Sequence, residues 1–259
     1  EMKIEIYKLI AKTYLRLGDP EKVDENFTAA LEIAKQPGFS PKIRFELYFS
    51  YADFLMLKKK YEESYIYLKL ALDIEGGLNG YKTEIYATVL STMGSYFLEG
   101  ELNQEKALLY FNRSIGIWKD IFNDNGGNKV NASFHDTRFV FAYRGKSKAL
   151  LRRYELNGDV ENLLRSLENY EWLIEQLERI GRNLQKENQE IVRTQLYPIY
   201  NEAISLAYKL YKITSSTYHQ KKAFTFSEKS KSAILLSSIQ NLNALKTSDI
   251  PKSILELDQ

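Results

Sequence analysis

Apolar side chains recur every three or four residues along most of this chain, a spacing that places them on one face of an α-helix. The first predicted helix has an inner face formed by Tyr7, Ile10, Ala11 and Tyr14. Gly18 interrupts the pattern, and Asp19 can cap a second helix with Pro20 at its first position, where the missing N–H costs nothing. That second helix turns Val23, Phe27, Ala30 and Leu31 inward. Residues 6–38 are therefore predicted to form a helical hairpin.

The hairpin pattern occurs twice more. The second copy begins at Ser40 and Pro41, and its inward residues are Tyr48, Tyr51, Ala52, Leu55, Leu68, Ala71 and Leu72. The inward residues of the third copy are Leu90, Met93, Gly94, Phe97, Ala107, Phe111, Ser114 and Ile115. Ala11, Ala52 and Gly94 occupy equivalent places, because two helices approach closely only where one of them lacks bulk. The copies are internal repeats of one helical unit.

Residues 4–122 resemble the tetratricopeptide repeat (TPR) family. The residues at its preferred positions are Gly18, Ala30, Tyr61, Ala71, Gly94, Ala107 and Phe111. Equivalent positions Val23, Ser64 and Ala107 lie 41 and 43 residues apart, which is longer than the usual period of about 34. The resemblance implies a right-handed α-solenoid in which the first helix of each hairpin faces the concave surface.

The second half of the chain continues the helical pattern with longer elements. The polar segment 123–133 is the predicted internal boundary, and a fourth hairpin follows it with a turn at Gly158 and Asp159. Residues 183–213 are predicted to form one long helix, or two helices joined near Pro198, and the last helix runs from about 218 to 245. The expected fold is all-α, with about five antiparallel hairpins. Three lie in 1–122 and two in 133–245, and 246–259 is a linker toward a further domain.

Composition narrows the classes of partner. Thirty-six basic and thirty-four acidic side chains give a formal net charge of +2, so nucleic acid is not the expected partner. The chain has no cysteine, which excludes disulfides and a thiol nucleophile within it. No apolar run reaches the length of a membrane helix, and the first residues lack the pattern of a signal peptide. We expect a cytoplasmic protein with no membrane segment here, given as a fragment that begins inside a helix.

The stretch AFTFSEKSKSAILLSSIQNL, residues 223–242, combines serines and lysines and raises the question of acyl-transfer chemistry. No serine stands three residues before a lysine, so the spacing of serine–lysine enzymes is missing, and a packed helix with solvated lysines explains the stretch. Its EKSK motif and the later DIPKSILELD resemble the end of the TPR region in CHAT-domain proteins, over residues 135–259. That family's caspase-like peptidase uses a histidine and a cysteine, so the resemblance implies a repeat region without the peptidase. Lys229 and Lys231 are then candidate contacts with the neighbouring domain.

The sequence gives little support for a metal site or a catalytic site. His135 and His219 are the only histidines and are far apart in sequence, and the loop NDNGGN has a single acidic residue, Asp124. Carboxylate pairs such as Glu62 and Glu63 fit exposed helix faces. We therefore expect no metal, no cofactor and no catalysis by this chain.

The repeat register predicts which side chains project toward the concave surface: Lys8, Lys12, Arg16, Phe49, Asp53, Met56, Thr88, Ser91 and Ser95. This mixture of charged, aromatic and small polar groups suits an extended peptide. The leading hypothesis is a non-catalytic protein-interaction scaffold, the sensing and docking region of a CHAT-type peptidase. The alternative is a peptide-binding receptor of bacterial signalling, either stand-alone or attached to a kinase.

Overall fold

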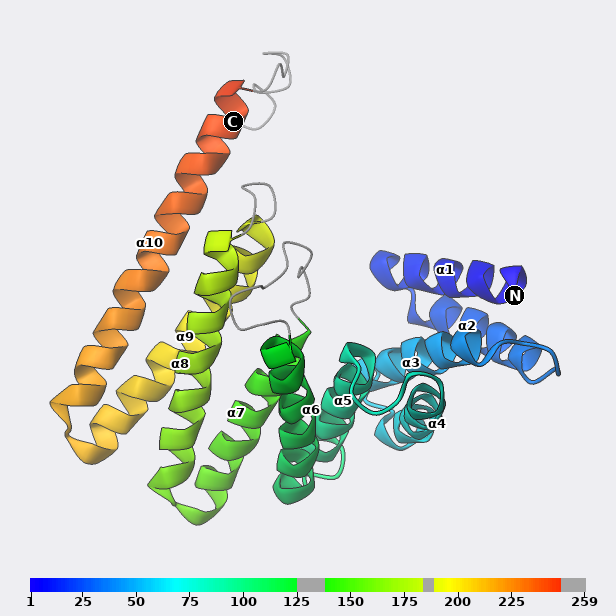
Figure 1. Ribbon diagram of the computed structural model, residues 1–259, viewed down its shortest axis with the longest axis horizontal. Helices are drawn as coiled ribbons and strands as arrows, with labels where there is room; N and C mark the ends of the chain where they lie inside the picture. Colours follow the sequence, from blue (N-terminus) through cyan, green and yellow to red (C-terminus); the bar gives the residue numbers. More distant parts are fainter. Residues whose placement is uncertain (125–137, 184–188, 248–259) are drawn as a thin grey trace. The chain divides into compact units, whose positions relative to one another are not determined.

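The computed structural model describes residues 1–124, 138–183 and 189–247. This part of the chain forms ten helices and no strand (Figure 1). Their bounds are α1 (Met2–Leu17), α2 (Pro20–Ala34), α3 (Pro41–Leu57), α4 (Tyr61–Asn79), α5 (Glu84–Glu99), α6 (Gln104–Asp124), α7 (Phe139–Asn157), α8 (Val160–Asn183), α9 (Gln189–Thr214) and α10 (Thr217–Thr247). The predicted all-α fold of helical pairs is confirmed. None of the described helices is both long and apolar enough to cross a membrane.

The helices belong to two compact units. The first contains α1–α6 and the part of α7 up to Arg153, and the second begins at Tyr154 and contains α8–α10. This division falls inside α7. The predicted boundary at 123–133 and the predicted linker at 246–259 lie mostly outside the described residues and stay predictions.

Short polar side chains begin the helices where the sequence predicted. The Asp19 carboxylate accepts a hydrogen bond from the backbone N–H of Lys22 at 3.2 Å, and the Ser40 hydroxyl accepts from that of Ile43 at 3.4 Å. Thr83 caps α5 in the same way. These bonds satisfy N–H groups that have no partner inside the helix.

Left-handed residues end several of the helices. Gly18 has φ = 74° and Gly158 has φ = 69°, which glycine adopts without a steric cost. Lys59 (φ = 58°) and Ser215 (φ = 54°) occupy the same conformation after α3 and α9, although they carry a Cβ. The turns are therefore equivalent in shape although only some of them use glycine.

The first unit has a continuous core in which small residues meet large ones. Ala11 and Ala52 are fully buried, as the repeat pattern predicted. The ring of Phe111 on α6 lies between two glycines: a Cβ at Gly94 would come within 2.8 Å of it, and a Cβ at Gly145 within 2.3 Å. The close approach of α5 and α7 to α6 therefore depends on both glycines, and the sequence pattern had identified only Gly94.

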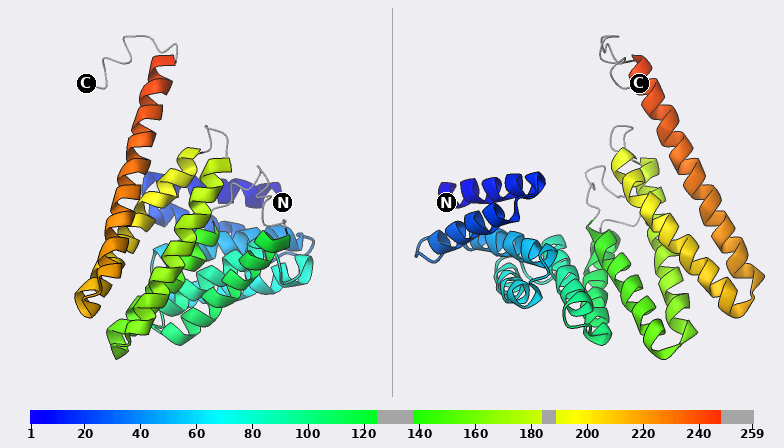
Figure 2. Two further views of the ribbon diagram at one scale, coloured as in Figure 1. Left: turned by 60° about the vertical axis from the view of Figure 1, so that its left-hand side comes forward. Right: turned by 180° about the vertical axis from the view of Figure 1, so that it is seen from behind.

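In the second unit α9 packs against both α8 and α10 (Figure 2). The helix α9 is continuous through Pro198, so the alternative of two helices joined near Pro198 is wrong. Residues 189–213 lie in this one helix, Asn183 ends α8, and 184–188 lie outside the described residues. The described core side chains are apolar residues of all three helices, including Leu173, Leu177, Ile199, Ala203, Leu206, Leu210 and Phe226. The last helix is close to its predicted bounds.

Candidate docking face on the first helices of the repeats

The first helices of the three N-terminal hairpins, α1, α3 and α5, present two rows of equivalent positions. Alignment on Ala11, Ala52 and Gly94 defines both rows. The first row is Lys8, Phe49 and Ser91, and the second row, one helical turn later, is Lys12, Asp53 and Ser95. All six belong to the predicted concave-face set, so the structure can be examined row by row.

The first row is used for packing. The Lys8 side chain is buried, and its Nζ lies 2.9 Å from a Glu5 carboxylate oxygen and 2.8 Å from one of Glu46. Burial by itself would lower the pKa of Lys8, but the hydrogen bonds with Glu46 and Glu5 outweigh it and hold the pKa above its ordinary value. Lys8 therefore joins α1 to α3 as a cation.

Ser91 is also buried. Its hydroxyl lies 2.8 Å from that of Ser114 on α6, and both hydroxyls reach the carbonyl oxygen of Ala87. The Phe49 ring is half-buried and stacks on Phe45 with ring centroids 5.9 Å apart. The prediction that Lys8 and Ser91 project into an open concave surface is wrong, because this row points into the contacts between neighbouring helices.

The second row is open. Lys12 and Asp53 are exposed, and Ser95 is half-buried. Neighbouring protein reduces the hydration of the Asp53 carboxyl group and raises its pKa to about 7, while the nearby positive charge of Lys12 opposes this shift. The Asp53 carboxyl group is therefore exposed but lies close to neighbouring protein. The second row therefore contains a carboxyl group, that of Asp53, whose hydration is reduced by the neighbouring protein.

The other predicted positions flank this row. Arg16 is exposed, one turn beyond Lys12. Met56 is half-buried against the core, and the half-buried Thr88 donates its hydroxyl hydrogen to the carbonyl of Glu84 at 2.7 Å. We define the docking face as the exposed and half-buried members of the predicted set: Lys12, Arg16, Phe49, Asp53, Met56, Thr88 and Ser95. Binding of a partner to this face stays a prediction.

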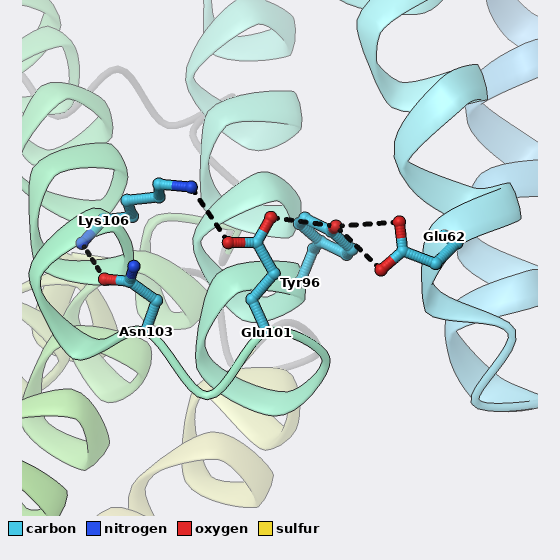
Figure 3. Close-up of polar contacts among 5 residues, drawn as sticks. All are labelled: Glu62, Tyr96, Glu101, Asn103 and Lys106. Atoms are coloured by element: carbon cyan, nitrogen blue, oxygen red, sulfur yellow. Dashed lines mark hydrogen bonds and ion pairs between the residues drawn. The ribbon is translucent and has the colours of Figure 1, made fainter.

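A polar network between α4, α5 and the following turn was not predicted (Figure 3). The buried Tyr96 hydroxyl lies 3.3 Å from both carboxylate oxygens of Glu62 and 3.1 Å from Glu101. Lys106 pairs with Glu101 at 2.9 Å, and this hydrogen bond is the main cause that lowers the pKa of Glu101. Asn103 caps the next helix through the backbone N–H of Lys106. One hydroxyl thus joins carboxylates from two successive hairpins.

Several tyrosines place a ring in the core and a hydroxyl on a carboxylate. The Tyr51 hydroxyl donates to Asp24 at 2.9 Å, and the Tyr200 hydroxyl donates to Glu178 at 2.5 Å. Both rings are buried. A buried phenol needs a hydrogen-bond partner, and in these residues a carboxylate supplies it.

The two lysines predicted to contact a further domain lie on α10. Lys229 pairs with Glu178 of α8 at 2.9 Å, and Lys231 pairs with its neighbour Glu228 at 2.8 Å. A second pair, Lys222 with Glu171 at 3.0 Å, joins the same two helices one heptad earlier. Lys229 is therefore engaged within the second unit, and its contact with another domain stays a prediction.

No metal centre is evident in the described side chains, which contain no group of three or more potential ligands. His219 is buried beside Tyr218, with ring centroids 5.2 Å apart. His135 and most of the loop with the single acidic residue lie outside the described part of the chain.

Comparison with known proteins supports the fold. No family model and no curated protein matches the chain. It is similar to the crystal structure of BtubC (BKLC) from P. vanneervenii, with a TM-score of 0.65 and 16% identity over 91% of this chain and 81% of that one. It is also similar to a kinesin light chain-like protein of Podospora anserina with nearly identical TPR-like repeats, with a TM-score of 0.57 and 11% identity over 87% and 95% of the two chains. The chain is a TPR-like helical repeat protein in its fold.

Proposed function

We propose that this chain is a non-catalytic scaffold that binds a protein or peptide through the docking face of its first unit. The observation that carries the proposal is the contrast between the two rows. The first row is occupied by contacts within the protein, whereas the second row leaves Lys12 and Asp53 exposed on the first helices of successive hairpins. Exposed opposite charges suit recognition of a polypeptide that carries complementary charges.

The chemistry of the docking face specifies the partner in outline. An acidic residue of the partner would meet Lys12 and Arg16, and a basic residue would meet Asp53. A cation beside Asp53 replaces the hydration that the surrounding protein removes, so this contact favours the ionised carboxylate. Phe49 and Met56 offer half-buried apolar surface next to these charges.

The experiment is capture of partners from a lysate of the source cell, with the whole chain as bait. The test variant is Lys12→Glu with Arg16→Glu, and the matched control is Lys119→Glu, which changes an exposed lysine of α6 outside the face. A second test is Asp53→Lys, with Asp73→Lys on α4 as its control. Loss of the same partner in both test variants and retention in both controls supports the proposal. Capture that is unaffected by the test variants overturns it.

The finer proposal is that the scaffold is the sensing and docking region of a CHAT-type peptidase. Its support is the sequence similarity of residues 135–259, including the EKSK motif on α10. The gene sequence downstream of Gln259 tests it, because a caspase-like domain with a histidine and a cysteine is required. A kinase or no further domain would favour the alternative, a peptide receptor in bacterial signalling.

A further inference from the structure

The first helix, α1, exposes an apolar stripe on the side away from its core contacts. Met2, Ile6 and Leu9 are 77%, 48% and 67% exposed, and Leu17 continues the stripe at the end of the helix. Their spacing of four, three and eight residues keeps them on one face of an α-helix. Ile4 and Ala11, on the opposite face, are fully buried. An aligned stripe of this length is an interaction surface rather than scattered exposure.

The internal repeats show what happens to this face elsewhere in the same unit. Three positions of α1 have equivalents on both later first helices: Ile6 with Leu47 and Val89, Ile10 with Tyr51 and Met93, and Thr13 with Phe54 and Tyr96. All six equivalents are buried, and Leu47 and Val89 are completely so. The same face that is covered in α3 and α5 is therefore open in α1.

The covering helices share a simple chemistry. On α3, the Phe27 ring of α2 packs against Tyr51 and Phe54, with centroids 5.3 and 5.8 Å away. On α5, the Tyr65 ring of α4 stacks on Tyr96 at 4.6 Å. In each case the preceding helix supplies an aromatic ring in its second or third turn.

A carboxylate accompanies each ring. Asp24 in the second turn of α2 accepts from Tyr51, and Glu62 in the first turn of α4 lies at the Tyr96 hydroxyl. Both tyrosines lie in the C-terminal half of the helix that carries them, so the start of the covering helix meets the end of the covered one. The pairs are therefore antiparallel, with an acidic residue at one end.

The end of α1 has the matching charge. Lys12 and Arg16 are exposed in the C-terminal half of α1, the half that carries Tyr51 in α3 and Tyr96 in α5. We propose that the stripe and these two cations form a docking site for an amphipathic helix that lies antiparallel to α1. The partner helix has apolar or aromatic residues every three to four positions and a carboxylate in its first two turns. This site shares Lys12 with the second row but not Asp53, and its apolar part is the stripe on the outer side of α1.

The test supplies such a helix. Residues 58–83, which contain α4 and its following loop, are duplicated ahead of Glu1. Glu1 precedes Ala11 by ten residues, as Glu84 precedes Gly94, so the copied helix meets α1 in the register in which α4 meets α5. We expect a higher Tm, and amide hydrogen exchange in α1 slower by at least about tenfold. No gain in either measurement overturns the proposal.

Matched variants separate docking from general stabilisation. Ile6→Glu with Leu9→Glu should abolish the gain from the duplicated helix, whereas Leu109→Glu, at an exposed position of α6, should leave it intact. Glu62→Lys in the duplicated copy should reduce the gain because it brings a positive charge to the half of α1 that carries Lys12 and Arg16. The same substitutions in the unextended chain measure their cost without the added helix. A gain that survives the Ile6 and Leu9 changes overturns the proposal.

A second measurement identifies the occupant. The unmodified chain is examined by analytical ultracentrifugation, and it is then titrated with a synthetic peptide of residues 58–83. We expect a monomer that binds the peptide, with binding lost in Ile6→Glu. Self-association that Ile6→Glu disperses would assign the stripe to a second copy and overturn the stated partner. Asp53→Lys should leave peptide binding unchanged, which separates this site from the proposed function.

Discussion

The two units hold their helices together by different means. In the first unit the contacts between successive hairpins include packed rings, Phe27–Tyr51 and Tyr65–Tyr96, with tyrosine hydroxyls on carboxylates, beside ion pairs such as Lys8–Glu46. In the second unit the ion pairs Glu171–Lys222 and Glu178–Lys229 join α8 to α10 at a seven-residue spacing. Packed rings resist changes of salt and pH, whereas partly exposed ion pairs respond to both. One repeat pattern thus supports two kinds of helix contact.

The largest expected effect tests the close packing of the first unit. Gly145→Ala would place a Cβ against the fully buried ring of Phe111, and we expect it to lower the free energy of unfolding by about 2–3 kcal/mol. The control is Gly116→Ala on α6, where a Cβ meets no atom within 4 Å. That change should stabilise the helix by up to about 1 kcal/mol. Equal effects in denaturant titrations would contradict the role assigned to Gly145.

The next effect compares one tyrosine from each unit. Tyr96→Phe removes a hydroxyl that joins two carboxylates, and we expect it to lower the free energy of unfolding by about 1 kcal/mol. Tyr200→Phe should cost about half as much by the same principle, because Lys229 still pairs with Glu178. Amide hydrogen exchange resolved by helix gives the two values separately. A larger loss in Tyr200→Phe would reverse the comparison.

The pH dependence of the first unit should include a contribution from Asp53. Its pKa is raised to about 7, so the folded state binds the proton more tightly than the unfolded chain does, and this contribution to stability declines as the pH rises from about 4 to 7. Asp53→Asn should remove this slope and stabilise the unit at pH 8. Because solvent reaches the carboxyl group, we expect this substitution to change the free energy of unfolding by no more than about 1 kcal/mol.

The measurement for Asp53 is the free energy of unfolding from pH 4 to 8, together with carbonyl NMR of the Asp53 side chain. Asp73→Asn, at an exposed position of α4, controls for the loss of one negative charge. A midpoint for Asp53 near 4 would show that its carboxyl group is fully hydrated and would contradict the raised pKa.

A smaller pair of changes compares equivalent turns in the two units. Lys59 and Ser215 both have the left-handed conformation that glycine prefers. Lys59→Gly and Ser215→Gly should each stabilise the chain by about 0.5 kcal/mol, since relief of the Cβ contact exceeds the added chain entropy. Thermal unfolding checks both, and Gly18→Ala should act in the opposite direction. Destabilisation by either glycine would show that the side chain matters more than the backbone.

The smallest effect is that of salt. Raising the ionic strength from 0.05 to 0.5 M should weaken the partly exposed pairs of the second unit by a few tenths of a kcal/mol. Lys222→Met with Lys229→Met should remove this sensitivity from α10, as measured by hydrogen exchange. If added salt lowers the hydrogen-exchange protection of α5 as much as that of α10, the distinction between aromatic and ionic contacts is wrong.

The sequence by itself determined the helices, their caps and the order of the hairpins. These features depend on local properties: the spacing of apolar residues, the capping oxygens of Asp19 and Ser40, and breaks at Gly18 and Gly158. The repeat register also identified the equivalent positions Ala11, Ala52 and Gly94. A helix is held by backbone hydrogen bonds between residues four apart, so the local sequence of each segment carries the information that specifies its helix.

Only the tertiary structure decided which predicted site residues are open. Lys8 and Lys12 lie one turn apart on α1, yet Lys8 is buried between Glu5 and Glu46 while Lys12 is exposed. A turn of four residues rotates a side chain by about 40° relative to its predecessor, which is enough to move it from a helix contact to solvent. The sequence placed both lysines on the same side of α1, and the packing of α3 separated them.

The long-range pairings also depended on tertiary structure. Phe111 lies against Gly145, and Glu178 meets Lys229 from a position 51 residues earlier. Charged residues are common on helices, and nothing in the local spacing of these residues or of the glycines selects a partner on another element. The packing of helices brings these groups within contact distance, and for that reason the sequence predicted the elements of this protein but not its network of contacts.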